Sequence, residues 1–182
     1  MNETNNMKEV FMDKVIEVDF LDREVKEVTK EDAHKHGVMH RAFSAVLFKG
    51  NSILIQQRAH DKYHCGGLWT NTCCSHPRWN EELKDAVHRR LYEEMGIKNV
   101  ELEEIFNFTY YYKFDNGLAE FEYDHVFIGE YDGEYNINKE EAVDAKWVDI
   151  DELMDWMKEK PYEFTPWFMI FVPRIKEYLK FS

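Results

Sequence analysis

The sequence has few of the features on which secreted and membrane proteins depend. It contains only three cysteines, Cys65, Cys73 and Cys74, and ordinary disulfide geometry disfavours a bond between the adjacent two. The longest apolar run, residues 167–172, has six residues, whereas a membrane-spanning helix needs about 20. The first residues, MNETNN, do not have the pattern of a secretion signal. We therefore expect free thiols and a location in the reducing cytoplasm.

Cations are also scarce. The chain has 23 Lys and Arg residues against 36 Asp and Glu residues, which gives a formal net charge of −13. Nucleic acids and anionic membranes bind to basic surfaces, so we expect neither as a partner. An anionic small molecule would need local cations or bound metal ions to overcome this charge. With only 4 prolines and 8 glycines, the chain is neither collagen-like nor a Pro/Gly-rich disordered segment.

The chain is long and apolar enough for one domain. Of its 182 residues, 44% are apolar and 15% are aromatic, which is sufficient for a substantial core. We expect a flexible extension over residues 1–12 and a single domain over residues 13–182. Turn sequences at Lys49-Gly50-Asn51 and Asp115-Asn116-Gly117 predict two hairpins. The predicted strands cover residues 14–20, 41–48, 52–58, 101–113, 118–130 and 145–148.

Helices are predicted where apolar residues recur every three or four positions. Residues 81–95 have this spacing, and Gly96 follows as a stop signal. The other predictions are a helical turn over residues 30–36, a helix to Lys158 capped by Asp149 or Asp151, and a last helix from Pro166 to about Leu179 that Pro173 should kink or break. Residues 59–76 are predicted to form a long loop. The order of elements predicts an α/β or α+β fold with a mixed sheet.

Two carboxylates on one predicted strand suggest a metal site. Glu120 and Glu122 are two residues apart, so both side chains leave the same face of the strand. Together with His34, His40 and His76 they would suit Mn²⁺, Mg²⁺ or Zn²⁺. The alternative is a solvated Glu-x-Glu pair in an acid-rich chain, in which histidines are common. The remaining histidines are His36, His60, His64, His88 and His125.

Other reactive or charged residues allow both a functional and a structural interpretation. Cys74 lies close to His76 and could be a nucleophile, a general acid or base, a metal ligand, or a buried thiol. Neighbours on a strand point to opposite faces, so only one of Cys73 and Cys74 can face a site. Glu93 and Glu94 oppose the dipole at the end of their helix, which calls for a compensating cation or metal ion unless they belong to a solvated run of surface charges. Four cations could hold a diphosphate or lie scattered on the surface: Lys30, Arg58, Lys62 and Arg90.

Considered together, these residues resemble a known family. Glu81, Arg89, Leu91, Glu93, Glu94 and Gly96-Ile97 have the spacing of the Nudix box, with Ser75 in place of its glycine and Arg90 in place of one glutamate. The loss of that glutamate argues against pyrophosphate hydrolysis. Five segments are similar to type I isopentenyl-diphosphate isomerases: His40 to Ser44, Gln56 to Arg58, Gly67 to Pro77, Glu120 to Glu122 and Thr165 to Phe168.

The resemblance implies a Nudix-like fold, with a mixed sheet between helices, and the interconversion of isopentenyl and dimethylallyl diphosphate in isoprenoid biosynthesis. A Nudix-type diphosphate hydrolase and a non-catalytic diphosphate-binding module are the alternatives. The resemblance also implies a protein that is a monomer or a weak dimer and binds a small-molecule substrate.

The resemblance assigns roles to individual residues. One divalent metal ion would be held by His34, His40, His76, Glu120 and Glu122, with His36 competing for the first place. A Mg²⁺ ion would bridge the diphosphate to Glu94 and to the backbone oxygen of Cys74, while Lys30, Arg58, Lys62 and Arg90 contact the diphosphate. Cys74 as base and Glu122 as acid would lie on opposite faces of the substrate, with Tyr111 supporting the glutamate and Trp167 facing a cationic carbon.

Overall fold

The fold is described from a computed structural model that covers residues 14–62 and 64–180. The strands are β1 (Lys14–Val18), β2 (Glu24–Thr29), β3 (His40–Lys49), β4 (Ser52–Arg58), β5 (Trp69–Thr70), β6 (Cys73–Ser75), β7 (Glu103–Lys113), β8 (Ala119–Glu130) and β9 (Ala142–Asp149). The helices are α2 (Lys30–His36), α3 (Leu83–Met95), α4 (Ile150–Glu159) and α5 (Pro166–Leu179), with a short 3₁₀ turn, η1 (Pro161–Glu163).

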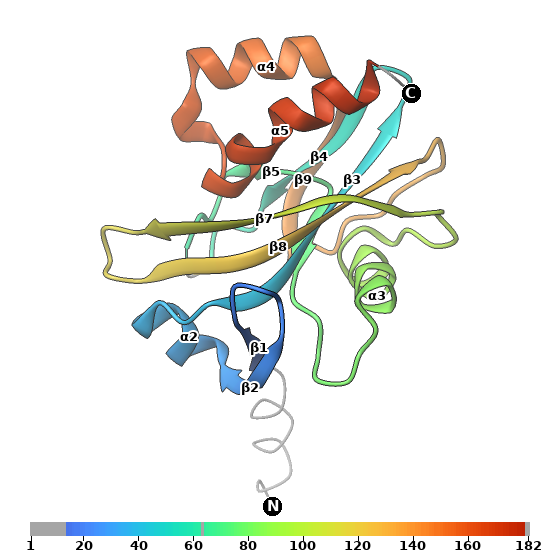
Figure 1. Cartoon of the computed structure of the whole chain (residues 1–182). Helices are drawn as coiled ribbons and strands as arrows, with labels where there is room; N and C mark the ends of the chain where they lie inside the picture. The colour runs from blue at the N-terminus through green and yellow to red at the C-terminus, as the bar shows by residue number, and fades with distance from the viewer. Residues whose placement is uncertain (1–13, 63, 181–182) are drawn as a thin grey trace, which may run out of the picture.

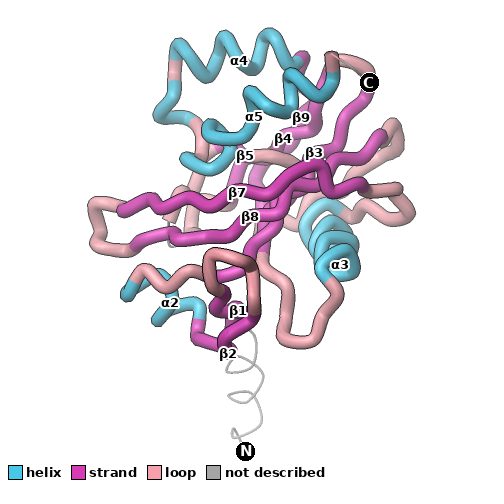
Figure 2. The backbone as a smooth tube through the Cα atoms, in the orientation of Figure 1, coloured by secondary structure: helices cyan, strands magenta, loops and turns pink. Residues whose placement is uncertain are grey.

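The strands form one mixed sheet with β3 near its centre. β3 pairs antiparallel with β1 and β6 and parallel with β8 along most of its length. β7 and β8 form a long antiparallel hairpin, which Figure 2 shows as two adjacent strands. β4 pairs with β9 and β5. The predicted hairpin of β3 and β4 exists only at its closed end, Phe48 to Ile53 and Lys49 to Ser52. Beyond it the two strands separate, because β3 continues its pairing with β8 and β6 instead.

Helices cover both faces of the sheet. Figure 1 shows α4 and α5 together on one side and α3 on the other. Alternating residues of β3 explain this arrangement: Phe43, Ala45 and Leu47 pack in the core cluster under α3, whereas Val46 packs in the cluster under α4 and α5. Both faces of the central strand are therefore buried, which is typical of a sheet with helices on both sides. The mixed sheet between helices is confirmed.

Several local predictions need correction. The first strand ends at Val18, and β2 was not predicted, because Glu24–Thr29 is largely exposed and lacks an apolar pattern. The long loop contains the short strands β5 and β6. Helix α5 is not broken at Pro173, since buried residues on both sides of it anchor the helix to the core. Of the two residues predicted to cap α4, the structure has Asp149 in that position. Its carboxylate accepts from the backbone N–H groups of Asp151 and Glu152.

The extension expected over residues 1–12 lies outside the described residues, so it stays a prediction. The single domain expected over residues 13–182 also stays a prediction, although all strands of the described residues belong to one sheet.

Polar side chains fill the gap where β3 and β4 separate. The Thr72 hydroxyl donates to the carbonyl oxygen of Leu54 on β4 at 2.6 Å and accepts from the N–H of Leu47 on β3 at 2.9 Å. The Asn71 amide donates to the carbonyl oxygens of Ala45 and Cys73. These bonds satisfy backbone groups that no strand covers, and they fix the segment that leads into β6.

Thr72 allows a test of this bridge. The isosteric substitution Thr72→Val leaves a buried N–H and a buried C=O without their partner, so we expect it to lower the free energy of unfolding by roughly 2–4 kcal/mol. Urea denaturation measures this loss. The matched control is Thr109→Val on the exposed side of β7, which should change stability by less than about 0.5 kcal/mol. Equal effects of the two substitutions would contradict the bridging role.

Candidate active site

A single cavity collects most of the residues that the sequence singled out. Its volume is about 310 Å³, and it opens between the central strands, the segment after β4 and the start of α5. Its lining includes the following predicted site residues: Lys30, Arg58, Lys62, Cys74, His76, Arg90, Glu94, Glu120, Glu122 and Trp167. His34 and His40 are fully buried beside Glu120. Tyr111 is not part of this lining.

Strand register brings the site together. In the parallel pair of β3 and β8, His40 lies opposite Glu122, and in the antiparallel pair of β3 and β6, Ser44 lies opposite Cys74. Glu120 and Glu122 share one face of β8, as predicted, and both are buried. Helix α2 adds His34 from the side. Residues more than 80 positions apart in the sequence therefore meet at one point.

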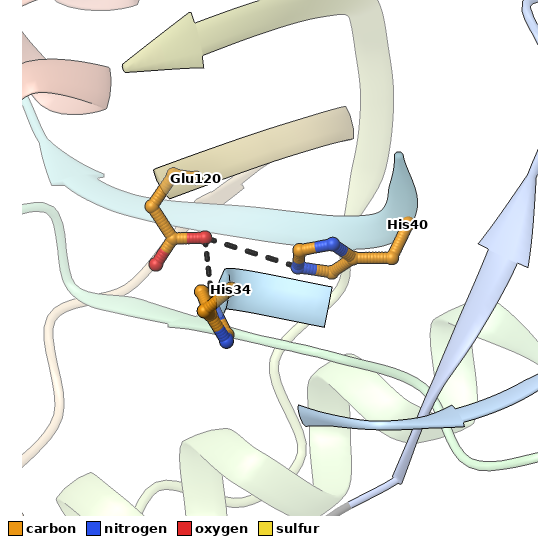
Figure 3. Close-up of side chains that lie close together, drawn as sticks. All are labelled: His34, His40 and Glu120. Atoms are coloured by element: carbon orange, nitrogen blue, oxygen red, sulfur yellow. Dashed lines mark hydrogen bonds and ion pairs between the residues drawn. The ribbon is translucent and has the colours of Figure 1, made fainter. Parts of the chain in front are cut away.

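The imidazole and carboxylate groups form two overlapping clusters that share His40. The first is His34, His40 and Glu120 (Figure 3), and the second is His40, His76 and Glu122. Nε2 of His34 lies 2.9 Å from Oε2 of Glu120, and Nε2 of His76 lies 3.0 Å from Oε1 of Glu122. Nε2 of His40 lies 3.5 Å from Glu122 and 3.8 Å from Glu120. His36, the competitor of His34, is exposed.

These groups fit a divalent metal ion. Nε2 of His40 is buried and beyond normal hydrogen-bond length of both carboxylates. Ligands bound at about 2.1 Å lie roughly 3 Å apart around one ion, which is close to the spacing of these atoms. Nδ1 of His34 is bonded to the carbonyl oxygen of Lys30, and Nδ1 of His40 to that of Val38. Such bonds place the proton on Nδ1 and leave the Nε2 lone pair to coordinate a metal ion.

The pKa shifts of Glu120 and Glu122 also favour binding of a cation. Burial by itself would raise the pKa of Glu122, but its contacts with His40 and His76 hold it well below its usual range. Burial and the charge of Glu122 would likewise raise the pKa of Glu120, and its contacts with His34 and His64 lower it. Both carboxylates are thus ionised, which is the form that binds cations.

Cys74 is the cysteine that faces the cavity. Cys73 points the other way, into the core under α3. Burial raises the pKa of Cys74 to about 12, although the guanidinium of Arg58, whose Nη1 lies 4.0 Å from Sγ, acts in the opposite direction. This shift favours the protonated thiol near neutral pH.

The tyrosine prediction is wrong by one residue. The hydroxyl of Tyr110 donates to Oε2 of Glu122 at 2.7 Å, and Tyr110 is buried in the cavity wall. Tyr111 is 58% exposed and packs against Phe121 on the outer face of the hairpin. Neighbouring residues of a strand face opposite sides, and β7 pairs Tyr110 with Glu122 and Tyr111 with Phe121.

Two of the four predicted cations, Lys62 and Arg90, are paired with carboxylates along one side of the cavity. Arg90 contacts Glu93, Glu94 and Glu141, and Nζ of Lys62 lies 2.6 Å from Glu141. Arg89 also contacts Glu93. The glutamates at the end of α3 therefore have the compensating cations that their position requires.

Two further residues of the site were not predicted. Asp124 continues the alternation of Glu120 and Glu122, accepts from the hydroxyl of Ser44, and is buried. Burial and the charge of Glu122 raise its pKa well above normal. The i, i+2 spacing was a signal that could have identified it. The other residue is His64, whose Nε2 lies 2.6 Å from Oε1 of Glu120. It lies within the long loop predicted over residues 59–76.

Comparisons with known proteins show the family and the fold. The model of the NUDIX domain family matches residues 38–168. Among solved structures, a protein from Deinococcus radiodurans superimposes with a TM-score of 0.66 at 14% identity, over 80% of this chain and 89% of the other. A MutT protein from Methanosarcina mazei superimposes with a TM-score of 0.62 at 16% identity, over 76% and 94%. The fold and site thus define a NUDIX-domain protein with a cluster of histidines and carboxylates. We call this set the histidine–carboxylate cluster: His34, His40, His76, Glu120 and Glu122.

Curated relatives narrow the assignment. The chain is 48% identical to isopentenyl-diphosphate Delta-isomerase 2 of Aromatoleum aromaticum over 90% of its own length and 86% of the relative. It is 44% identical to isopentenyl-diphosphate Delta-isomerase of Pectobacterium atrosepticum over 90% and 92%. The chain belongs to the isopentenyl-diphosphate Delta-isomerase family, within the NUDIX-domain proteins. Within the described residues, no helix has the length and apolar character to span a membrane.

Metal binding can be tested without any substrate. We expect the purified, chelator-treated protein to bind one Mn²⁺ ion at the histidine–carboxylate cluster, as measured by electron paramagnetic resonance titration. His40→Ala should weaken binding at least 100-fold, because His40 belongs to both clusters. His36→Ala is the control, since His36 is exposed on the same helix as His34. Unchanged Mn²⁺ affinity in His40→Ala would refute the site.

Proposed function

We propose that this protein interconverts isopentenyl diphosphate and dimethylallyl diphosphate by adding a proton to one carbon and removing a proton from another. The observation that carries the proposal is that Cys74 and Glu122, from different strands, both line one cavity beside the histidine–carboxylate cluster. Relatives that are 43–48% identical over most of the chain carry the name of this isomerase.

The diphosphate belongs at the cationic side of the cavity. Arg58, Lys62 and Arg90 line it there, and Lys30 lines it near the histidines. Lys62 and Arg90 already contact Glu141, so the local charge is nearly balanced before a substrate arrives. Glu94, which is buried in the same wall, would hold the Mg²⁺ ion together with the backbone oxygen of Cys74. A divalent cation there would supply the positive charge that a diphosphate needs in so acidic a protein.

The reaction needs one protonated group and one basic group on opposite sides of the substrate. We assign proton delivery to Glu122 and proton removal to Cys74. The raised pKa of the Cys74 thiol favours its protonated form, and the lowered pKa of Glu122 favours the carboxylate. The assigned roles need the opposite arrangement, a Cys74 thiolate and a protonated Glu122. One proton must therefore first pass from the sulfur to the network formed by Glu122 and the groups bonded to it. The hydroxyl of Tyr110 belongs to that network, and the nearby Arg58 guanidinium favours the thiolate.

Protonation of the terminal alkene carbon creates a tertiary carbocation, which must be kept from water. Trp167 lines the cavity, and its indole N–H donates to the hydroxyl of Thr70 at 3.1 Å, which fixes the ring. The ring of Trp167 can stabilise positive charge by about 2 kcal/mol or more when desolvated, without acting as a nucleophile.

The location and assembly of the protein are also part of the proposal. All three cysteines are free, which supports a reducing cytoplasm. The metal of the histidine–carboxylate cluster is Mn²⁺, Mg²⁺ or Zn²⁺, and we propose a monomer or weak dimer that needs neither nucleic acid nor membrane.

Product analysis tests the proposal directly. We expect incubation with isopentenyl diphosphate, Mg²⁺ and Mn²⁺ to give dimethylallyl diphosphate by NMR, with no release of phosphate or pyrophosphate. Arg90 stands where hydrolytic Nudix enzymes have a glutamate, and it is bonded to Glu93 and Glu94. Release of phosphate from a nucleoside-diphosphate panel, with no shift of the double bond, would establish a hydrolase instead.

The two adjacent cysteines give a matched pair of variants. We expect Cys74→Ala to lower the isomerisation rate by at least 1000-fold, because it removes the group that takes the proton. Cys73→Ala should retain near-native activity with reduced thermal stability, since its thiol lies in the core under α3. Rates are followed by NMR in deuterated buffer. A Cys74→Ala protein of near-native rate would remove the thiol from the mechanism.

The neighbouring tyrosines give a second matched pair. Tyr110→Phe deletes the hydroxyl that donates to Glu122 and should lower kcat by about 10–100-fold. Tyr111→Phe removes an exposed hydroxyl on the outer face and should leave kcat unchanged. The reverse result would restore the role that the sequence gave to Tyr111.

A further inference from the structure

His64 is the histidine of the cavity that no motif explains. It lies in the segment between β4 and β5 and is 8% exposed. Its Nε2 atom lies 2.6 Å from Oε1 of Glu120, while Oε2 of the same carboxylate faces His34 at 2.9 Å. The two oxygens of Glu120 thus have different partners: one points to the predicted metal ligands, and the other points to His64.

The ring of His64 also lines the cavity and contacts two other rings. It stacks on Phe114, with centroids 4.9 Å apart and planes inclined by 12°. Phe114 begins the turn between β7 and β8. The edge of His64 meets the ring of Trp167 at the start of α5, with centroids 6.2 Å apart. One side chain therefore joins three segments of the chain at the cavity wall.

We propose that His64 is a positioning residue with two separable functions. Its Nε2 atom holds Glu120 so that a single oxygen is directed to the metal site, and its flat ring, between Phe114 and Trp167, keeps water from the carbon chain of the substrate. The second function rests on the proposed isomerase activity, whereas the first does not.

The first function follows from the geometry of a carboxylate. Without a partner for Oε1, the Glu120 side chain can rotate and its oxygens can exchange places. Groups that orient metal ligands in this way typically contribute 10–100-fold to metal affinity. Glu120 is buried beside His34 and His40 (Figure 3), so rotation of its carboxylate would weaken metal binding at these residues.

The second function follows from the chemistry of the carbocation. If water reaches the tertiary cation, its oxygen forms a C–O bond to the cationic carbon and then loses one proton, which gives 3-hydroxy-3-methylbutyl diphosphate. No oxidant or reductant is needed. The ratio of this tertiary alcohol to dimethylallyl diphosphate therefore measures how well the wall excludes water.

Two substitutions separate the functions. His64→Phe keeps a flat ring against Phe114 but has no nitrogen for Glu120. His64→Gln keeps an N–H donor that can reach Glu120 but loses the ring. His36→Gln, on the exposed side of α2, is the control for general effects of removing a histidine. Should His64→Phe fail to fold, His64→Leu, which also lacks the nitrogen, carries the same expectation for metal binding.

We expect His64→Phe to weaken Mn²⁺ binding by at least tenfold, with an unchanged number of coordinated imidazoles in the pulsed electron paramagnetic resonance spectrum and an unchanged alcohol fraction. His64→Gln should bind Mn²⁺ within about threefold of the unmodified protein and raise the alcohol fraction at least fivefold. Wild-type Mn²⁺ affinity in His64→Phe would overturn the first function. Loss of one imidazole signal would also overturn it, because His64 would then be a ligand.

An unchanged alcohol fraction in His64→Gln would overturn the second function. Failure of either proposed role of His64 can be distinguished from failure of the proposed isomerase activity. If the unmodified protein does not isomerise isopentenyl diphosphate, the proposed function falls, and the Mn²⁺ affinities of the His64 variants still decide the first function by themselves.

Discussion

The structure depends on the burial of two carboxylates side by side. Glu120 and Glu122 lie on one face of β8 with almost no exposure to solvent, in a chain of net charge −13. Buried like charges are unstable unless hydrogen bonds and opposite charges surround them. Imidazoles from α2, β3 and the segment after β6 provide those contacts. The same arrangement that solves this electrostatic problem also makes a site for a divalent cation.

The central strands place the reactive groups around these carboxylates. β3 contacts β8 in parallel and β6 in antiparallel register, so one strand aligns His40 with Glu122 and Ser44 with Cys74. The polar bridge through Thr72 fixes the approach to β6. At the end of α3, Arg90 stands where the Nudix box has a glutamate, and it is bonded to Glu93 and Glu94. The fold is thus that of NUDIX-domain proteins. The residues at the site favour proton transfer to and from carbon over hydrolysis of a diphosphate.

The strongest local patterns were sufficient to predict much of this site. The alternation of Glu120 and Glu122 predicted a shared face, and the spacing of apolar residues predicted α3, which begins two residues later than expected. Tyr110 and Tyr111 could not be separated, because both lie in a run of tyrosines in which alternation gives no apolar or polar contrast. The unbroken α5 at Pro173 likewise reflects tertiary packing, which outweighs the local cost of proline.

The sequence by itself determined the family, the acidic charge, the mixed sheet and the chemical types of the site residues, because these follow from composition, short-range periodicity and motif spacing. Only the tertiary structure decided which tyrosine reaches Glu122, that burial raises the pKa of the Cys74 thiol, and that His64 lies against Glu120. Those facts depend on strand register and on burial between segments far apart in the chain. Neither register nor burial is encoded by neighbouring residues alone.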